Sequence, residues 1–524
     1  MRSNVHHLLE EHACSRPDVP ALTYLDETVS YRRLWDCTRG AAAGLAMLGL
    51  QRGERVAVYL EKRIDTVVAI FGTSLAGGVF VPVNPALRAP QVRHILDDCA
   101  VTVLVTSPTR FGVLQQELLD CPGLRHVVLV GTGQQKDNPR RHYRVHSWPV
   151  VCGESDTDTA PVVAVETDIA AILYTSGSTG KPKGVVLSHR NLIAGAESVA
   201  QYLQNTADDV VLAVLPLSFD AGFSQLTTAF SVGAHVVLAN YLRPADIPRL
   251  CARHGVTALT CVPPLWIQIA EQPWTAAAAV ALRYFANTGG RLPKPTLDKL
   301  RALFPLARPF LMYGLTEAFR STYLDPEEVD RRPDSIGKAI PGTEIIVARP
   351  DGSVCDPGEE GELVHRGPSV ALGYWNDPVR SAERFKPWHL HPPDCPTTER
   401  VVWSGDTVVA DEEGFLYFVG RADEMIKTSG YRVSPTEIEE VAYATQWVGG
   451  AIAVGVADEC LGQRVVLVVS PADPESFDTV ELLAVMRAHL PLYMVPSEVT
   501  VWREIPRSPN GKFDRNAIRE ALGP

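Results

Sequence analysis

The chain has 524 residues, of which 46% are hydrophobic and 21% charged, and it carries a formal net charge of -12 at pH 7. This length exceeds what one hydrophobic core supports, so it predicts at least two domains or large subdomains. The acidic balance, with no basic run to offset it, argues against binding to nucleic acid or to an anionic membrane surface.

The N-terminal segment predicts a helix and not a targeting signal. Residues 1–12 lack an apolar core and carry early acidic residues, unlike a secretory signal. His6, His7 and His12 fall on the same predicted amphipathic helix as two leucines, so we do not expect them to hold a metal.

The cysteines and the longest uncharged stretch both indicate a cytosolic enzyme without a membrane span. The cysteines lie far apart with no C-x-x-C pair, which is typical of free thiols in a reducing compartment. Residues 66–87 are uncharged but are interrupted by glycines and prolines, so they predict a helix, a turn and a strand. The cysteines are Cys14, Cys37, Cys99, Cys121, Cys152, Cys251, Cys261, Cys355, Cys395 and Cys460.

Between about residues 50 and 315, short apolar runs alternate with segments whose apolar residues recur at helical spacing. This alternation predicts an α/β fold with largely parallel, buried sheets and flanking helices. The predicted strands are 55–60, 101–106, 169–174, 185–188, 210–215, 235–239 and 257–262. The predicted helices are 88–98, 244–254, 293–304 and one that starts near Asn191.

The sequence changes character beyond residue 340. Its turn-rich segments predict antiparallel hairpins and hence a small β-subdomain, and the proline-rich residues 386–399 predict a surface insertion without regular structure. A compact α+β unit is predicted from helices at 435–444 and 478–489 and strands at 451–456, 464–470 and 498–502. We therefore expect a large N-terminal domain at 1–420 and a small C-terminal domain at 421–524.

Residues 174–184 read Y-T-S-G-S-T-G-K-P-K-G and join two of the predicted strands. Glycines leave room for backbone N–H groups to face an anion, while the hydroxyls add donors and the lysines add positive charge. A Walker A loop is excluded, because the glycines are too close together, a proline follows the first lysine and no helix follows directly. On these residues alone, the loop is either a phosphate cradle or a solvated hairpin tip.

Five segments, in chain order, resemble the motifs of the adenylate-forming superfamily, which includes acyl-CoA synthetases, adenylation domains of nonribosomal peptide synthetases and luciferases. They are T-S-G-S-T-G-K-P-K-G (175–184), Y-G-L-T-E (313–317), S-G-D (404–406), G-R-A-D-E-M-I-K-T-S-G-Y-R-V (420–433) and S-P-N-G-K-F-D-R (508–515). The resemblance covers essentially the whole chain and implies that the loop at 174–184 clamps the triphosphate of ATP.

The resemblance also implies a two-step reaction. A carboxylate oxygen attacks the α-phosphorus of ATP to give an acyl adenylate and pyrophosphate, and the acyl group then passes to a thiol. Because both reactants of the first step are anions, the enzyme must hold them together and neutralise the charge that builds up. The implied cofactors are ATP and Mg²⁺, and the implied thiol is CoA or the phosphopantetheine of a separate carrier protein.

By the same resemblance, one set of residues holds the nucleotide. Tyr313 would stack on adenine, Thr316 would touch the α-phosphate, and Glu317 would bind Mg²⁺. Asp406 would accept hydrogen bonds from both ribose hydroxyls, which suit the two oxygens of a carboxylate, and Arg421 would contact the nucleotide. The β- and γ-phosphates would be held by Thr175, Ser176, Gly177, Ser178, Thr179, Gly180 and Lys183.

Gly289 and Gly290, in N-T-G-G-R, resemble the segment whose backbone faces adenine, although a plain tight turn explains this glycine pair almost as well.

The C-terminal motifs imply a mobile small domain. Asp423 matches the hinge about which relatives rotate this domain between the two half-reactions. Lys512 would approach the carboxylate and the α-phosphate only in the first state, and the alternative interpretation is a surface lysine in an exposed turn. In the second state a thiol tunnel would be lined by Lys427, Ser429, Gly430 and Tyr431.

The segment 215–226 matches the region that lines the acyl pocket in relatives. Phe219 and Asp220 stand where typical fatty acyl-CoA synthetases carry an aromatic–histidine pair, whereas many amino-acid-activating domains carry such an aspartate to anchor the substrate ammonium. An ionised aspartate in an apolar pocket needs a cation beside it, which favours an amino-acid substrate. An equally strong alternative is that Asp220 caps a helix starting near Gly222.

Two related functions therefore stay open. One is an acyl-CoA synthetase-like ligase for a small carboxylic acid. The other is a stand-alone amino-acid ligase, for example a prolyl one, that loads a separate carrier protein. The sequence ends twelve residues after Lys512, so we expect no fused carrier domain. A non-catalytic nucleotide-binding scaffold is a third hypothesis, against which the presence of Glu317, Asp406 and Lys512 argues.

Overall fold

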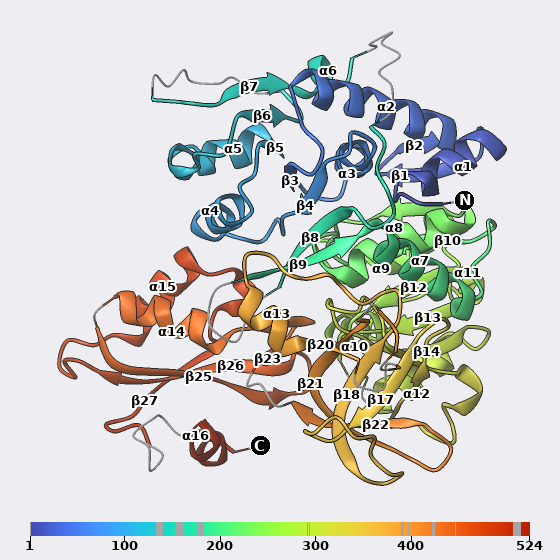
Figure 1. Ribbon diagram of the computed structural model, residues 1–524. Coiled ribbons are helices and arrows are strands. Elements are labelled where there is room, and N and C mark those ends of the chain that lie inside the picture. The colour runs from blue at the N-terminus through green and yellow to red at the C-terminus, as the bar shows by residue number, and fades with distance from the viewer. Residues whose placement is uncertain are drawn as a thin grey trace.

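The computed structural model describes residues 2–132, 140–153, 162–175, 182–290, 292, 294–388, 392, 394–396, 398–421, 425–445, 447–506 and 515–523. Its described part contains one mixed sheet and one mainly parallel sheet with helices packed on and between them, and a smaller sheet near the C-terminus (Figure 1). This arrangement confirms the predicted α/β class.

The larger sheet combines a parallel half with an antiparallel half. Its strands follow the order β17 (Glu344–Ala348), β18 (Glu360–Arg366), β21 (Arg400–Ala410), β22 (Leu416–Arg421), β16 (Ser335–Ala339), β15 (Thr322–Leu324), β14 (Arg308–Tyr313), β13 (Tyr284–Asn287), β12 (Ala258–Cys261), β10 (Val210–Ala213), β11 (His235–Leu238), β1 (Pro20–Tyr24) and β2 (Glu27–Ser30). From β14 to β1 neighbouring strands are parallel, whereas from β14 to β17 they are antiparallel. The antiparallel half contains the β-subdomain predicted beyond residue 340, but it begins earlier, with β15 and β16.

The second sheet follows the order β19 (Gly373–Tyr374), β9 (Lys183–Ser188), β8 (Ile169–Thr175), β4 (Val79–Pro82), β3 (Arg55–Tyr59), β5 (Val103–Thr106), β6 (His126–Leu129) and β7 (Arg144–Ser147). Its strands are parallel except at β9 and β19. The antiparallel pair β8–β9 carries the loop that the sequence singled out.

Helices fill the space between and around the two sheets. α3 (Ile64–Leu75) and α8 (Asp220–Val232) join them through buried aromatic contacts: the ring of Phe223 lies 6.4 Å from that of Phe71 on α3 and 5.3 Å from that of Phe80 on β4. The other helices before the β-subdomain are α1 (His7–Ser15), α2 (Tyr31–Met47), α4 (Ala89–Asp98), α5 (Pro108–Leu114), α6 (Trp148–Val151), α7 (His189–Leu203), α9 (Asp246–His254), α10 (Pro263–Ala270), α11 (Ala276–Ala281) and α12 (Lys294–Leu303).

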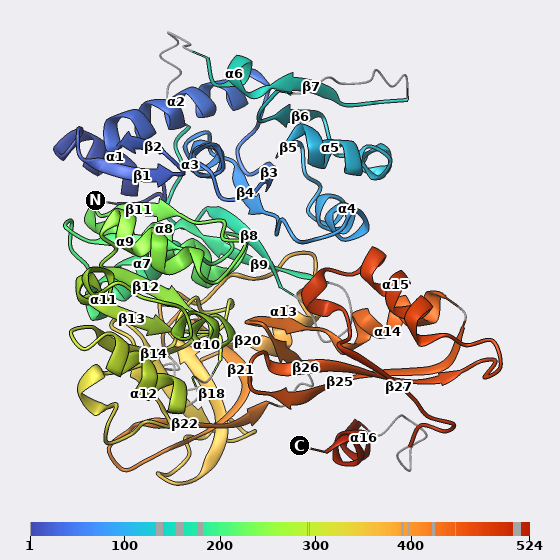
Figure 2. The same cartoon turned by 180° about the vertical axis from the view of Figure 1, so that it is seen from behind.

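The C-terminal unit has its own sheet and its own apolar cores. It contains β23 (Ile426–Thr428), β24 (Tyr431–Val433), α14 (Pro435–Ala444), β25 (Val448–Asp458), β26 (Gly462–Pro471), α15 (Thr479–His489), β27 (Glu498–Val501) and α16 (Arg515–Leu522). Helices α14 and α15 cover one face of this sheet and α16 covers the other (Figures 1 and 2). Because both cores draw only on residues from 426 onward, this unit is separate from the main body.

The structure confirms the predicted strands and helices and corrects three details. The helix expected from about Asn191 begins at His189, where Ser188 forms a capping box with Asn191. Residues 386 and 387, predicted to lack regular structure, belong to β20 (Phe385–Pro387), which pairs with β21 beside α13 (Pro378–Arg384). Helix α8 begins at Asp220, two residues before the expected start near Gly222. Among the described residues, no helix has both the length and the hydropathy that a membrane span requires.

Candidate active site

A cation, a carboxylate and a phenol converge where β9 begins. Lys183, the first residue of β9, places its Nζ 3.0 Å from Glu317 Oε1 and donates a hydrogen bond of 2.8 Å to the hydroxyl of Tyr374. That hydroxyl in turn donates to Glu317 Oε1 at 2.7 Å. Thr175, at the end of β8, lies opposite Lys183 in the strand register. Two of the predicted ATP residues are therefore in direct contact beside the ends of β8 and β9.

The carboxylate of Glu317 is held in its charged form. Burial by itself raises the pKa of Glu317, but the ammonium of Lys183 and the hydrogen bond from Tyr374 outweigh burial, so the pKa lies well below its ordinary value. Burial raises the pKa of Tyr374, and the neighbouring Glu317 raises it further, so the phenol keeps its proton. The site therefore presents a fixed negative charge next to a fixed positive one.

A second cluster joins β14 and β21 of the larger sheet to the C-terminal unit. Tyr313, at the end of β14, donates a hydrogen bond of 2.5 Å to Asp406 Oδ2 on β21. Arg432 reaches across from the C-terminal unit and places Nη2 3.9 Å from the same oxygen. Asp406 is only 1% exposed. The residues predicted to hold adenine and ribose are thus neighbours although they lie far apart in sequence.

Asp220 has an internal cation as its partner. Arg320 Nη1 lies 3.0 Å from Asp220 Oδ2, the hydroxyl of Thr316 lies 3.4 Å from Oδ1, and both charged side chains are at most 4% exposed. The alternative hypothesis that Asp220 caps a helix is wrong, because its backbone is already helical, Phe219 is the N-cap residue and no side-chain cap is formed. Asp220 instead turns toward Arg320 in the first turn of α8.

The C-terminal unit faces this site with the turn between β23 and β24. Gly430, in a left-handed conformation with φ of 80°, lies so close to Val262 that an added Cβ would approach its side chain to 2.7 Å. Gly289 faces the same turn, since an added Cβ there would lie 3.9 Å from the carbonyl oxygen of Gly430. The Nζ of Lys427 lies 4.5 Å from the ring centroid of Phe418.

Contacts within the C-terminal unit and with the large domain hold the turn between β23 and β24 in place. Tyr431 stacks on Tyr493, with ring centroids 3.8 Å apart. The unit also contacts α4, where Gln91 donates to Glu437 at 2.6 Å. In the large domain, the side-chain amide of Asn287 donates a hydrogen bond to the carbonyl oxygen of Gly290. This bond holds the separate turn that carries Gly289 and Gly290.

Some predicted site residues lie outside the described residues. The side chain of Arg421 is among them, although its backbone ends β22 opposite Asp406. The others are Ser176, Gly177, Ser178, Thr179, Gly180, Asp423 and Lys512.

Sequence reasoning missed three side chains that complete the site. Tyr374 lies on a strand of two residues, with no charge or motif to mark it. Arg432 lies within a recognised motif that implies no role for it, and Arg320 follows the Y-G-L-T-E motif by three residues. A search for the cation that a buried Asp220 requires would have singled out arginines near that motif.

His365 braces the turn behind Glu317. Its ring is fully buried, with Nδ1 3.0 Å from the hydroxyl of Ser321 and Nε2 3.0 Å from that of Ser369. Burial lowers the pKa of His365 to about 3. The folded protein therefore holds this imidazole in its neutral form.

Replacing His365 with glutamine is expected to make stability depend less steeply on pH. In the wild type the unfolded chain binds a proton below about pH 6.5 while the folded state does not, so the free energy of unfolding falls by up to about 1.4 kcal/mol per pH unit as the pH drops from about 6 to 4. Glutamine keeps both hydrogen-bonding ends but cannot titrate. Urea unfolding at pH 7, 6 and 5 measures the difference, and equal slopes for both proteins would contradict a neutral, buried His365.

The described part of the chain offers no conventional metal cage. No group of three or more His, Cys, Asp or Glu side chains lies close enough to bind an ion among the described residues, and all ten cysteines are free thiols. The first cluster instead offers one ionised carboxylate and one ammonium side by side. Such a pair suits a polyanionic ligand that brings its own metal ligands.

Comparisons with known proteins point to one family. Residues 9–375 match the family described as AMP-binding enzyme, and residues 437–512 match the AMP-binding enzyme C-terminal domain. The long-chain-fatty-acid–CoA ligase of Salmonella typhimurium is 32% identical, covering 98% of this chain and 93% of that protein. The indoleacetate–CoA ligase of Aromatoleum aromaticum is 29% identical, covering 98% of this chain and 97% of that protein.

Solved structures show the same architecture. The o-succinylbenzoate CoA synthetase of Bacillus subtilis, bound to a product analogue, has a TM-score of 0.84 and 26% identity, covering 99% of this chain and 98% of that chain. An amide bond synthetase from Marinactinospora thermotolerans has a TM-score of 0.86 at 23% identity, with 99% of each chain covered, and it supports the fold alone.

Proposed function

The chain belongs to the AMP-binding enzyme family, and from that premise we propose which residues carry out its reaction. It is an AMP-forming acid–thiol ligase, which uses ATP to convert a carboxylic acid into an acyl adenylate and then transfers the acyl group to a thiol to form a thioester. The observation that carries our assignment is that the motif at 313–317 contacts two other distant motifs, through Glu317 to Lys183 and through Tyr313 to Asp406.

In the first half-reaction we assign the triphosphate to the loop at 175–180 and to Lys183. The ammonium of Lys183 already faces a carboxylate, so it is oriented toward the position where anionic oxygens would bind. Asp406 would take the ribose hydroxyls, and Tyr313 would give up its hydrogen bond to Asp406 as it turns its ring to adenine. Thr316, one residue before Glu317, would donate to the α-phosphate.

Glu317 fits a role as the protein ligand of Mg²⁺. Its carboxylate is ionised and lies beside the lysine expected to hold the phosphates. Mg²⁺ is commonly bound by one or two carboxylates together with substrate phosphates and water, so a single ionised carboxylate suffices here. The ion would neutralise charge on the phosphates, while Lys183 and Thr316 orient them.

The second half-reaction would use the face of the C-terminal unit that the structure presents to the site. Gly430 packs against Val262 and faces Gly289, which supports a passage lined by Lys427, Ser429, Gly430 and Tyr431. We place the domain boundary between residues 420 and 421, at the end of β22, with Asp423 as the hinge. The separate apolar cores of the two units support such a rotation.

We propose a non-amino carboxylic acid as the substrate and CoA as the acceptor. An amino-acid substrate would need Asp220 to hold its ammonium, but Arg320 already supplies the positive charge at 3.0 Å. Loading of a separate carrier protein is the second hypothesis. The similarity to a linear gramicidin synthase protein of Brevibacillus parabrevis supports it, at 28% identity over 98% of this chain and 6% of that protein.

Replacing Lys512 with alanine tests the division into two half-reactions. Acyl-adenylate formation should fall by about 10²–10³-fold, the loss expected when one preorganised charged donor is removed. Thioester formation from a supplied acyl adenylate should change little. Pyrophosphate exchange measures the first step and CoA consumption the second, and an equal loss in both would contradict the role assigned to Lys512.

A further inference from the structure

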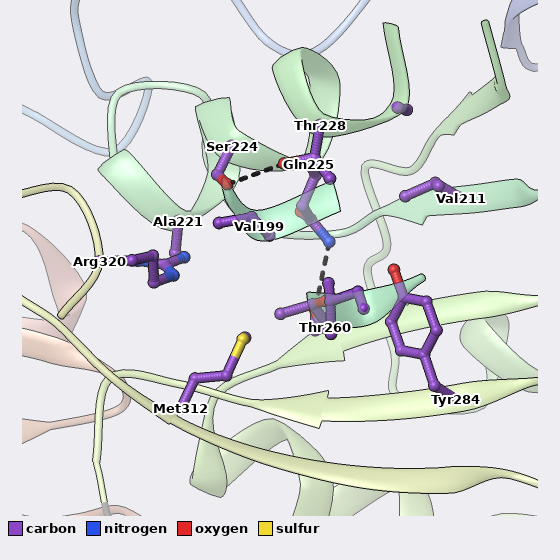
Figure 3. A pocket seen from close by; sticks show the side chains of 12 residues that line it. Val199, Val211, Ala221, Ser224, Gln225, Thr228, Thr260, Tyr284, Met312 and Arg320 are labelled. Carbon is purple, nitrogen blue, oxygen red and sulfur yellow. Dashed lines mark hydrogen bonds between the residues drawn. The ribbon is translucent and has the colours of Figure 1, made fainter. Parts of the chain in front are cut away.

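A small cavity lies directly behind the Asp220–Arg320 pair. Helix α8 and the parallel strands of the larger sheet enclose it, and Figure 3 shows Arg320 at one end, Ser224 and Thr228 above and Met312 below. All of its lining side chains are buried. The hydroxyl of Thr316, which we assign to the α-phosphate, lies 3.4 Å from Asp220 Oδ1, so the pair in front of the cavity borders the proposed adenylate site.

The cavity has room for a very small group only. The centre of a water molecule can occupy about 20 Å³ of it, which is enough for one or two waters. A hydroxyl or carbonyl oxygen with its carbon fits this space, whereas a long alkyl chain does not.

The lining carries hydrogen-bonding capacity that the protein does not use. Arg320 is 2% exposed and donates from Nη1 to Asp220 and to the carbonyl oxygen of Phe319. It also interacts with the hydroxyl of Tyr202, but its Nε has no hydrogen-bond partner among the described residues. The hydroxyls of Ser224 and Thr228 lie 3.3 Å apart and can each make a further bond. Thr260 adds a third hydroxyl to the lining. Buried donors of this kind are normally satisfied, so Nε marks where an acceptor binds.

The charges of Asp220 and Arg320 decide which hydrogen-bond acceptors of a substrate can enter the cavity. The guanidinium would repel the ammonium of an amino acid, and Asp220, 3.0 Å from Nη1, would repel a second carboxylate. The pair is neutral as a whole, so a neutral oxygen is the acceptor that meets Nε without leaving a buried charge uncompensated.

We infer that this enzyme activates short carboxylic acids that carry a hydroxyl or keto oxygen, which Arg320 recognises through Nε inside the cavity. This inference rests on the proposed function and names its substrate class. Arg320 and Thr260 are then specificity-determining residues, and the Asp220–Arg320 pair replaces the ammonium anchor that the sequence suggested. The reaction that supplies this substrate must therefore yield a short carboxylic acid with a hydroxyl or keto group on its chain.

A substrate panel measured by pyrophosphate exchange tests the inference. Hydroxylated or keto derivatives of butyrate should exceed butyrate itself in kcat/KM by at least about tenfold, because the unsubstituted acid leaves a buried donor unpaired. Succinate, proline and dodecanoate should rank below butyrate. A preference for dodecanoate or succinate would overturn the inference while leaving the proposed function intact, whereas a preference for proline would overturn both the inference and the proposed non-amino substrate. Absence of exchange with every acid would refute both.

Substitutions at the cavity test whether it causes the preference for oxygenated acids. The double variant Asp220→Asn/Arg320→Met removes both buried charges together. In this variant the kcat/KM for the oxygenated acid should lie within about threefold of that for butyrate. The matched control is Asp209→Asn/Arg283→Met, which removes another ion pair, 2.7 Å long, in the same domain and should keep the wild-type preference. If the first double variant does not fold, Thr260→Val provides the same test by removing one lining hydroxyl at nearly constant shape. An unchanged preference in either cavity variant would overturn the inference.

Discussion

Replacing Glu317 with glutamine is expected to slow acyl-adenylate formation by at least about 10³-fold. The substitution keeps the shape of the side chain but removes the ionised carboxylate that we assign to Mg²⁺, and a metal that neutralises phosphoryl charge contributes several kcal/mol to the barrier. It also leaves the ammonium of Lys183, 3.0 Å away, without its carboxylate. Pyrophosphate exchange over a range of Mg²⁺ concentrations measures the effect, and the Mg²⁺ requirement should rise.

The variant Tyr374→Phe measures how much the positioning of Glu317 contributes to the reaction, apart from its charge. This variant removes the hydrogen bond of 2.7 Å to Glu317 and the one of 2.8 Å from Lys183, yet it leaves both charges in place. We expect about a tenfold loss, the scale of one hydrogen bond to a charged group. If Tyr374→Phe and Glu317→Gln were equally impaired with the same Mg²⁺ requirement, the metal role of Glu317 would be wrong.

The sequence could predict those parts of the site that depend on local pattern. Lys183 and Glu317 each belong to a short motif, and the strands that position them are apolar runs whose period and length indicate strands. The contact between the two side chains follows from the fold, because β9 and the end of β14 lie in different sheets. Tyr374 could not be predicted, since its role arises only when β19 pairs with β9 beside Lys183.

The Asp220–Arg320 pair could not be predicted in full from the sequence. The sequence reveals an aspartate in an apolar stretch and therefore a requirement for a positive charge, but it does not say whether the substrate or the protein supplies that charge. The answer depends on a contact between residues one hundred positions apart. The same limit applies to the packing of Gly430 against Val262, because one sequence can serve two arrangements of the C-terminal unit.

Replacing Gly430 with tryptophan is expected to reduce thioester formation by at least about 10³-fold while acyl-adenylate formation continues. Even a Cβ at this position would approach Val262 to 2.7 Å, and an indole would need space that the large domain occupies. The C-terminal unit could then not adopt the arrangement seen here, which we assign to the second half-reaction. Overpacking at an interface costs several kcal/mol when neither side can yield.

Gly462→Trp is the matched control for this prediction. Gly462 also has φ of 80° in the same unit, so a side chain there suffers the same backbone strain, but an added Cβ would meet only the carbonyl oxygen of Lys427 at 3.4 Å and the site is exposed. CoA consumption from a supplied acyl adenylate should therefore fall in Gly430→Trp and stay near wild type in Gly462→Trp. A parallel loss in both variants would mean that backbone strain, and not blocked docking, causes the defect. A loss of pyrophosphate exchange in Gly430→Trp alone would instead place this turn in the first half-reaction, and the assignment of the observed arrangement to thioester formation would have to be abandoned.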